Sequence, residues 1–101
     1  VDGAFDLYET ELEGGTTRRL TQTPFDEWDP RYSPDGEWLV YAARADDNWD
    51  LFRSARSSLE ASRVTHTRGD EWDPAFTKDG RAILYGGEYG IFRGIYRIPN
   101  P

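Results

Sequence analysis

The chain has 101 residues and a net charge of −7, from 19 acidic and 12 basic residues. Binding to nucleic-acid phosphates depends on clustered lysine and arginine, so this acidic balance argues against a nucleic-acid partner. The longest apolar run, residues 38–43, is far shorter than the ~20 residues that span a bilayer, so we expect no membrane span. No signal peptide is present in this stretch, and the absence of cysteine excludes disulfides.

The sequence repeats itself every 44 residues without a gap. The pentapeptide Asp-Glu-Trp-Asp-Pro at 26–30 returns at 70–74, and the Asp-Gly pair at 35–36 returns at 79–80. A period of about 40–45 residues with several short strands per unit is typical of a β-propeller blade. Closed propellers need roughly 4–8 blades, so this all-β chain is expected to form an incomplete propeller of about two and a quarter repeats.

The expected elements, in chain order, give four antiparallel strands per repeat. Residues 4–12 and 17–23 read as the last two strands of a first blade. A whole blade follows, with strands at 31–33, 37–44, 49–55 and 63–67, and three more strands are expected at 73–77, 81–87 and 91–98. We therefore expect one partial propeller domain, with a half blade at 1–24, a full blade at 25–68 and a three-strand blade at 69–101.

Two local signals support this assignment of the strands. Pro34-Asp35-Gly36 is a turn sequence in which the glycine can take a positive φ. The strand after it has a continuous apolar centre, which favours burial on both faces, as for a strand between two neighbouring blades. The two ends of the chain leave strand edges and blade faces open, so we expect self-association or membership of a longer protein.

The repeat resembles a known family. Leu20-Thr21, the segment 28–41 with Ser33-Pro34-Asp35-Gly36, and Asp50-Leu51-Phe52 together resemble the repeat of TolB-type propellers, also called the PD40 or WD40-like β-propeller repeat. The second copy departs from the family pattern, because Thr77-Lys78-Asp79-Gly80 stands where the family has Ser-Pro-Asp-Gly. The resemblance covers essentially the whole chain and implies the fold more firmly than an activity.

The resemblance implies a non-catalytic module of a periplasmic or otherwise extracytoplasmic propeller, which binds a protein or a peptide and needs no cofactor. Similar blades also occur in peptidases of the prolyl-oligopeptidase type. The alternative function is therefore a propeller fragment that gates a separate catalytic domain of a larger enzyme. The chain itself has no Gly-x-Ser-x-Gly nucleophile motif, so we nominate no catalytic residue and expect no enzyme activity.

One end of the blades is expected to collect acidic side chains, because successive loops of an up-and-down blade alternate between its two ends. The candidate binding residues are Asp26, Glu27, Asp46, Asp47, Asp70 and Glu71. Such a face suits a basic peptide or a hard cation such as calcium. The alternative is a structural role for the repeated pentapeptide, or simply solvated loops. No EF-hand spacing is present, and the single histidine, His66, has no companion ligand, so no metal site is nominated.

The four tryptophans are expected to serve packing rather than ligand binding. Trp28 and Trp72 occupy equivalent positions in the repeat and should fill the space between blades. Trp38 precedes the buried second strand and Trp49 opens the third. Stacking against a ligand remains the second interpretation of these rings.

Overall fold

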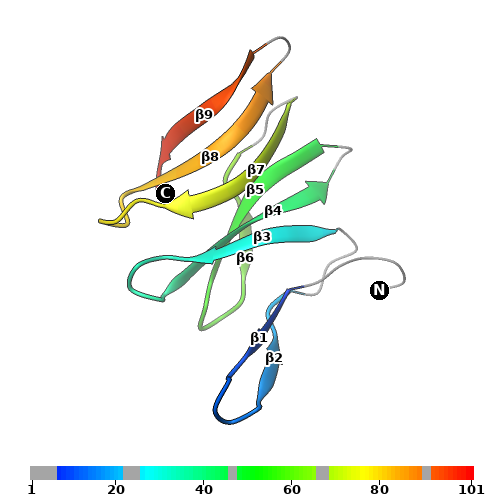
Figure 1. The fold of residues 1–101 in the computed structure, drawn as a ribbon, viewed down its shortest axis with the longest axis vertical. Coiled ribbons are helices and arrows are strands. Elements are labelled where there is room, and N and C mark those ends of the chain that lie inside the picture. The colour runs from blue at the N-terminus through cyan, green and yellow to red at the C-terminus, as the bar shows by residue number, and fades with distance from the viewer. Residues whose placement is uncertain (1–6, 22–25, 46–47, 66–68, 90–91) are drawn as a thin grey trace.

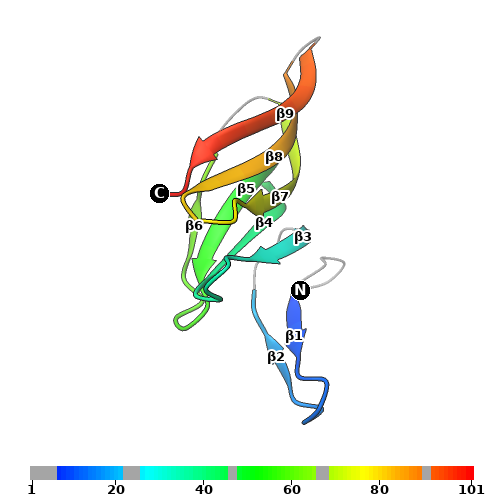
Figure 2. The same cartoon turned by 60° about the vertical axis from the view of Figure 1, so that its left-hand side comes forward.

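The computed structural model describes residues 7–21, 26–45, 48–65, 69–89 and 92–101. Within these residues the chain forms three antiparallel sheets of two, four and three strands, and no helix (Figure 1). The sheets follow one another in chain order, and Figure 2 shows the same succession from a second direction. This confirms the prediction of an all-β chain with four antiparallel strands per blade. The division into one domain with the blade limits given above stays a prediction.

Each sheet keeps its strands in sequence order. The first blade contains β1 (Tyr8–Thr10) and β2 (Thr17–Arg19). The second blade contains β3 (Glu27–Tyr32), β4 (Trp38–Ala45), β5 (Asn48–Ala55) and β6 (Ala61–Arg63). The third blade contains β7 (Asp70–Phe76), β8 (Ala82–Tyr89) and β9 (Phe92–Pro99).

The first strands of the second and third blades begin earlier than predicted. The pentapeptide forms the start of β3 and of β7, whereas the predicted strands began at residues 31 and 73. The ladder from β3 to β4 is interrupted between Trp28 and Arg31, and the third blade has the same irregularity. Asp29 and Asp73 have φ values of 57° and 52°, a left-handed conformation that aspartate tolerates better than most residues. The following proline cannot donate to the ladder, so it fits a bulge.

The fourth strand of the second blade ends earlier than predicted. We had expected residues 63–67, but β6 pairs Ala61 to Arg63 with β5. The backbone N–H groups of Val64 and Thr65 both donate to the carbonyl of Leu51, at 2.8 and 3.3 Å, and this shared acceptor ends the ladder. After β6 the chain turns inward, and the Thr65 hydroxyl accepts a hydrogen bond from the N–H of Leu51 on β5.

The turn between the first two strands has the predicted geometry in both copies. Gly36 has a φ of 76° and Gly80 a φ of 74°. The Ser33 hydroxyl donates to Asp35 at 2.6 Å, and the Thr77 hydroxyl donates to Asp79 at 2.7 Å. The change from Ser-Pro-Asp-Gly in the first copy to Thr-Lys-Asp-Gly in the second therefore leaves the turn unchanged, because a threonine hydroxyl replaces the serine hydroxyl.

The core lies between the blades. Leu39 and Tyr41 on β4 pack toward the first blade, where they meet Leu7 and Leu20. Alternate residues of the same strand face the third blade in a second cluster, which contains Val40, Ala42, Leu51, Ile83 and Tyr85. This confirms the prediction that the central strand is buried on both faces. Since β-strand side chains alternate between faces, a single strand supplies both clusters.

Candidate functional site

The acidic residues predicted from the sequence do not share one environment. Asp26 is half-buried, and its carbonyl accepts a hydrogen bond from the N–H of Arg44 at 3.0 Å. Asp70 is exposed and lies at the start of β7. Asp46 and Asp47 lie outside the described residues. The start of β3 lies beside the end of β4, because Glu27 pairs with Ala43, and the start of β7 lies beside the end of β8, because Asp70 pairs with Glu88.

Glu27 and Glu71 are buried and join consecutive blades. Glu27 is 2% exposed and Glu71 is 0% exposed. The Thr21 hydroxyl donates to Glu27 and the Thr65 hydroxyl donates to Glu71. Each hydroxyl also accepts a backbone hydrogen bond at 2.9 Å, from Leu7 in the first blade and from its equivalent in the second. Each glutamate therefore has a structural partner in the preceding blade.

We did not predict this Thr–Glu pair, although the sequence contains a signal for it. A threonine stands six residues before the glutamate of the pentapeptide in both copies, at Thr21 and Thr65. Glu71 receives an additional donor, because the Tyr89 hydroxyl donates to it at 2.6 Å. Burial raises the pKa of Tyr89, and its hydrogen bond to Glu71 raises that pKa further. The second blade has alanine at the equivalent position, residue 45.

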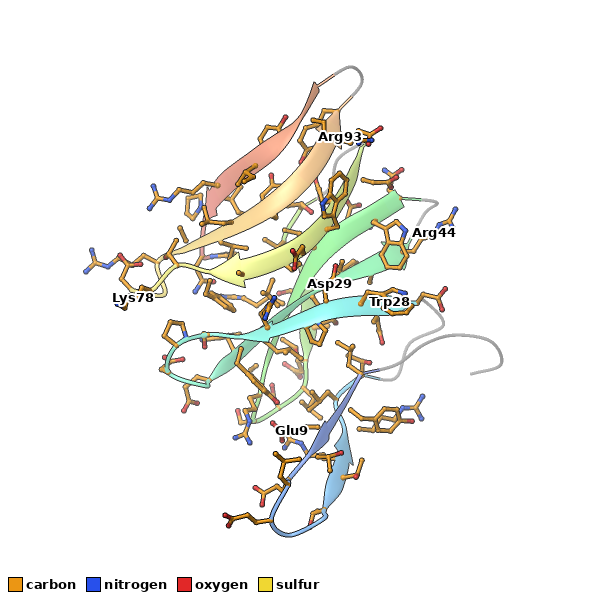
Figure 3. The ribbon with its side chains drawn as sticks, in the orientation of Figure 1. Glu9, Trp28, Asp29, Arg44, Lys78 and Arg93 are labelled. Atoms are coloured by element: carbon orange, nitrogen blue, oxygen red, sulfur yellow. The ribbon has the colours of Figure 1, made fainter. Side chains whose placement is uncertain are left out.

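A hollow of about 380 Å³ lies between the second and third blades at the acidic end. We call it the tryptophan hollow, and its lining residues are Trp28, Asp29, Ala42, Trp49, Asp70 and Trp72. Figure 3 shows Trp28 and Asp29 on β3, with Asp29 lying between β3 and β7. Three of the four tryptophans of the chain thus line one hollow, and the indole ring of Trp72 lies against Gly86.

The prediction that Trp28 fills the space between blades is wrong. Its side chain is 48% exposed and lines an open hollow between the second and third blades. Trp72 is half-buried and lies against Gly86, where an added Cβ would be 2.4 Å from the indole nitrogen. Glycine at position 86 therefore allows Trp72 to lie close to the backbone of β8.

The electrostatics of the tryptophan hollow are set by two carboxylates. Asp70 Oδ1 accepts the backbone N–H of Trp49 at 2.9 Å, and Asp29 Oδ2 accepts the backbone N–H of Asp73 at 3.0 Å. These bonds fix both carboxylates at the junction of the blades. Among the described residues that line the hollow there is no lysine or arginine. The hollow therefore combines negative charge with aromatic surface.

Other chemistry has less support in the described part of the chain. No group of three or more His, Cys, Asp or Glu residues there could hold a metal ion. Within the same residues, no helix has the length and apolar composition needed to cross a membrane.

Comparison with known proteins identifies the fold. No protein-family model matches the chain, and no curated protein matches it. A solved structure named as a TolB from Agrobacterium tumefaciens superposes with a TM-score of 0.84 and 27% identity, over 97% of this chain and 35% of that chain. TolB from Acinetobacter baumannii superposes with a TM-score of 0.80 and 26% identity, over 91% of this chain and 23% of that chain. The chain therefore has a TolB-like β-propeller fold and corresponds to a part of such a propeller.

Proposed function

We propose that this chain is a non-catalytic protein-interaction module, part of a TolB-like propeller that acts in the periplasm or another extracytoplasmic compartment. The observation that carries this proposal is the superposition on two TolB structures over nearly the whole chain. The alternative, a propeller that gates a peptidase domain, gains no support from these similar structures. Because the chain covers 35% and 23% of their lengths, the other blades of a complete propeller contribute to the partner surface as well.

The binding surface that we propose is the acidic end of the blades. Asp26 and Asp70 contribute from the described residues, and Asp46 and Asp47 follow from the sequence. The chain has a net charge of −7, and the carboxylates at this end would attract a basic segment of a partner. Glu27 and Glu71 belong to this proposal as buried supports, since they hold the first strands in place rather than meet solvent.

Fluorescence anisotropy with a labelled peptide of alternating lysine and glycine tests this surface. Replacing Asp26→Asn together with Asp47→Asn should weaken binding about fivefold at low salt, because both changes remove charge from the proposed surface. The matched control is Glu37→Gln with Glu60→Gln, which removes the same charge from exposed positions at the opposite end. Equal weakening by both pairs, or no binding by the parent, would contradict the proposal.

We also propose that the outer face of the third blade is covered in the working protein, by another blade of a longer chain or by a second copy. Leu84 is 38% exposed and Ile95 is 82% exposed. Their equivalents in the second blade, Val40 and Leu51, are 0% exposed. Light scattering over a range of concentrations tests self-association: a discrete oligomer supports the second copy, and a strict monomer supports cover by further blades.

A further inference from the structure

We infer that the outer edge of β9 binds an extended segment of a partner protein with the sequence Arg–(Leu or Val)–Thr, which adds to the sheet as a fourth strand. β9 pairs with β8 on one side, and no described strand lies along its other side (Figure 1). An open strand edge offers backbone groups to an added strand. This site is separate from the acidic end, and its chemistry follows from the two blades in which the same edge is occupied.

The backbone of Ile95 offers the two groups that hold the fourth strand in the other blades. Ile95 occupies the register on β8 that Leu51 occupies on β4. The N–H of Leu51 donates to the Thr65 hydroxyl at 2.9 Å, and its carbonyl accepts the N–H of Val64 at 2.8 Å. Leu7 in the first blade forms the same two bonds, at 2.9 and 2.8 Å. The N–H and carbonyl of Ile95 therefore point away from β8, toward an added strand.

An aromatic ring beside this edge favours an arginine in the added strand. In the second blade the guanidinium carbon of Arg63 lies 5.5 Å from the centroid of the Phe52 ring. In the first blade Arg19 lies over Tyr8 in the same way, at 6.0 Å. Tyr96 is the equivalent of both rings in the third blade. An arginine paired with Tyr96 would gain the cation–π contact that the other two blades have.

The exposed aliphatic side chains of the third blade favour an aliphatic residue after that arginine. Val64 packs in the cluster between the second and third blades, and Leu20 is 5% exposed in the cluster between the first and second. On the outer face of the third blade, Ile95 is 82% exposed and Leu84 is 38% exposed. A leucine or valine paired with Ile95 would cover part of this apolar surface.

The edge admits only a short strand. Pro99 follows Ile95 and Arg97 at the alternate positions of β9, and it has no N–H to offer outward, so an added ladder cannot extend past Arg97. The fourth strands of the other blades, β2 and β6, have three residues each. The length of the open edge therefore matches a segment of the proposed size.

A partner protein is favoured over a second copy of this chain as the source of the segment. The pattern occurs twice in the chain, at residues 19–21 and 63–65. The threonines of both segments donate to buried glutamates, Thr21 to Glu27 and Thr65 to Glu71. A second copy could supply either segment only by breaking its own core, whereas a free extended segment loses no such contacts.

Titration of the full chain with acetyl-Ala-Ser-Arg-Val-Thr-amide, the sequence of residues 61–65, tests the inference by ¹H–¹⁵N NMR. We expect saturable shifts and slower hydrogen exchange for the backbone N–H groups of Ile95 and Arg97. The same peptide methylated at the valine nitrogen cannot donate to the Ile95 carbonyl and should bind at least about tenfold more weakly. Absence of a saturable shift, or equal binding of the methylated peptide, would overturn the inference.

Variants of β9 sharpen this test. Ile95→Pro removes the outward N–H and should abolish binding, whereas the matched control Ile95→Ala keeps that group and should weaken binding less than about fivefold. Gly94→Asp introduces the residue of the second blade, where Asp50 accepts a hydrogen bond from Arg63, and should strengthen binding about fivefold. A Cβ at position 94 would meet no atom within 4 Å. Full affinity in a folded Ile95→Pro variant would overturn the inference, and the methylated peptide decides if that variant does not fold.

The edge and the acidic end can fail separately. Asp26→Asn with Asp47→Asn should leave the shifts of Ile95 and Arg97 unchanged, because these carboxylates do not belong to the edge. If the signals of β9 instead move with protein concentration in the absence of peptide, a second copy occupies the edge and the inference is wrong.

Discussion

The second and third blades share a sequence register but differ in what covers them. Val40 and Leu51 are fully buried on the face that the second blade turns toward the third. Leu84 and Ile95 occupy the same positions one repeat later and are exposed. The difference shows that a position in this repeat acquires its environment from the next blade, not from its own sheet. In repeat architectures of this kind, stability is shared between units and their interfaces.

The sharpest test of this comparison is one truncation made at equivalent positions. Leu51→Ala should lower the free energy of unfolding by about 2–5 kcal/mol, because it opens a cavity in the core between the blades. Ile95→Ala should change it by less than about 0.5 kcal/mol, because the side chain is already in solvent. Denaturant unfolding at low protein concentration measures both. A comparable loss of stability at Ile95 would contradict its exposure and show that this face of the third blade is covered in solution.

A second test concerns the residue beneath the tryptophan of each blade. Gly86→Ala should cost about 1–3 kcal/mol, since the new methyl group would press on the Trp72 ring. Ala42, at the equivalent position under Trp28, already carries that methyl group. Thermal unfolding measures the loss, and the Trp72 indole N–H signal should shift. An unchanged signal would mean that Trp72 does not rest on this glycine.

The Thr–Glu pairs provide a third test. Thr65→Val removes the donor to a fully buried glutamate and should cost about 1–3 kcal/mol. Tyr89→Phe should cost less, about 1 kcal/mol, and should be additional to the first only in part, because both hydroxyls bind Glu71. A double-mutant cycle in chemical unfolding measures this coupling. Strict additivity would show that the two donors act independently.

The smallest expected effect is a pH dependence common to both blades. Hydrogen bonds from the Ser33 hydroxyl and the N–H of Glu37 lower the pKa of Asp35. The N–H of Arg81 and the Thr77 hydroxyl lower the pKa of Asp79. A carboxyl group with a lowered pKa in the folded state stabilises the protein above its ordinary pKa of 3.8, and this contribution is lost as the pH falls below that value.

Thermal unfolding between pH 2 and 6 checks this acid limb. Asp35→Asn and Asp79→Asn should each flatten it slightly and by similar amounts, because the two turns have the same hydrogen bonds. A much larger effect at one turn would show that the two copies are not energetically equivalent.

The sequence predicted the parts of the fold that depend on local signals. The period of the repeat gave the four-stranded blade, and the Asp-Gly pairs gave turns whose glycines have a positive φ. The alternation within residues 38–43 followed from one strand packing against two neighbours. These features need only the chemistry of a few adjacent residues.

The parts that were missed depend on contacts between distant residues. The early start of β3 depends on Asp29 adopting a positive φ, which composition alone does not indicate. The burial of Glu27 depends on a threonine hydroxyl from the preceding blade. The exposure of Trp28 depends on how the third blade sits beside it. For the candidate site, the sequence predicted an acidic end, but it did not indicate that three tryptophans line one hollow, because they come from separate strands of two blades.

The Thr–Glu pairs give the assembly of the propeller a polarity. The glutamate of the second blade receives its hydroxyl from the first blade, and the glutamate of the third receives its hydroxyl from the second. During synthesis the donor therefore leaves the ribosome before the carboxylate that it must satisfy. When folding proceeds from the amino end, the threonine of one blade is therefore already present when the glutamate of the next blade becomes buried.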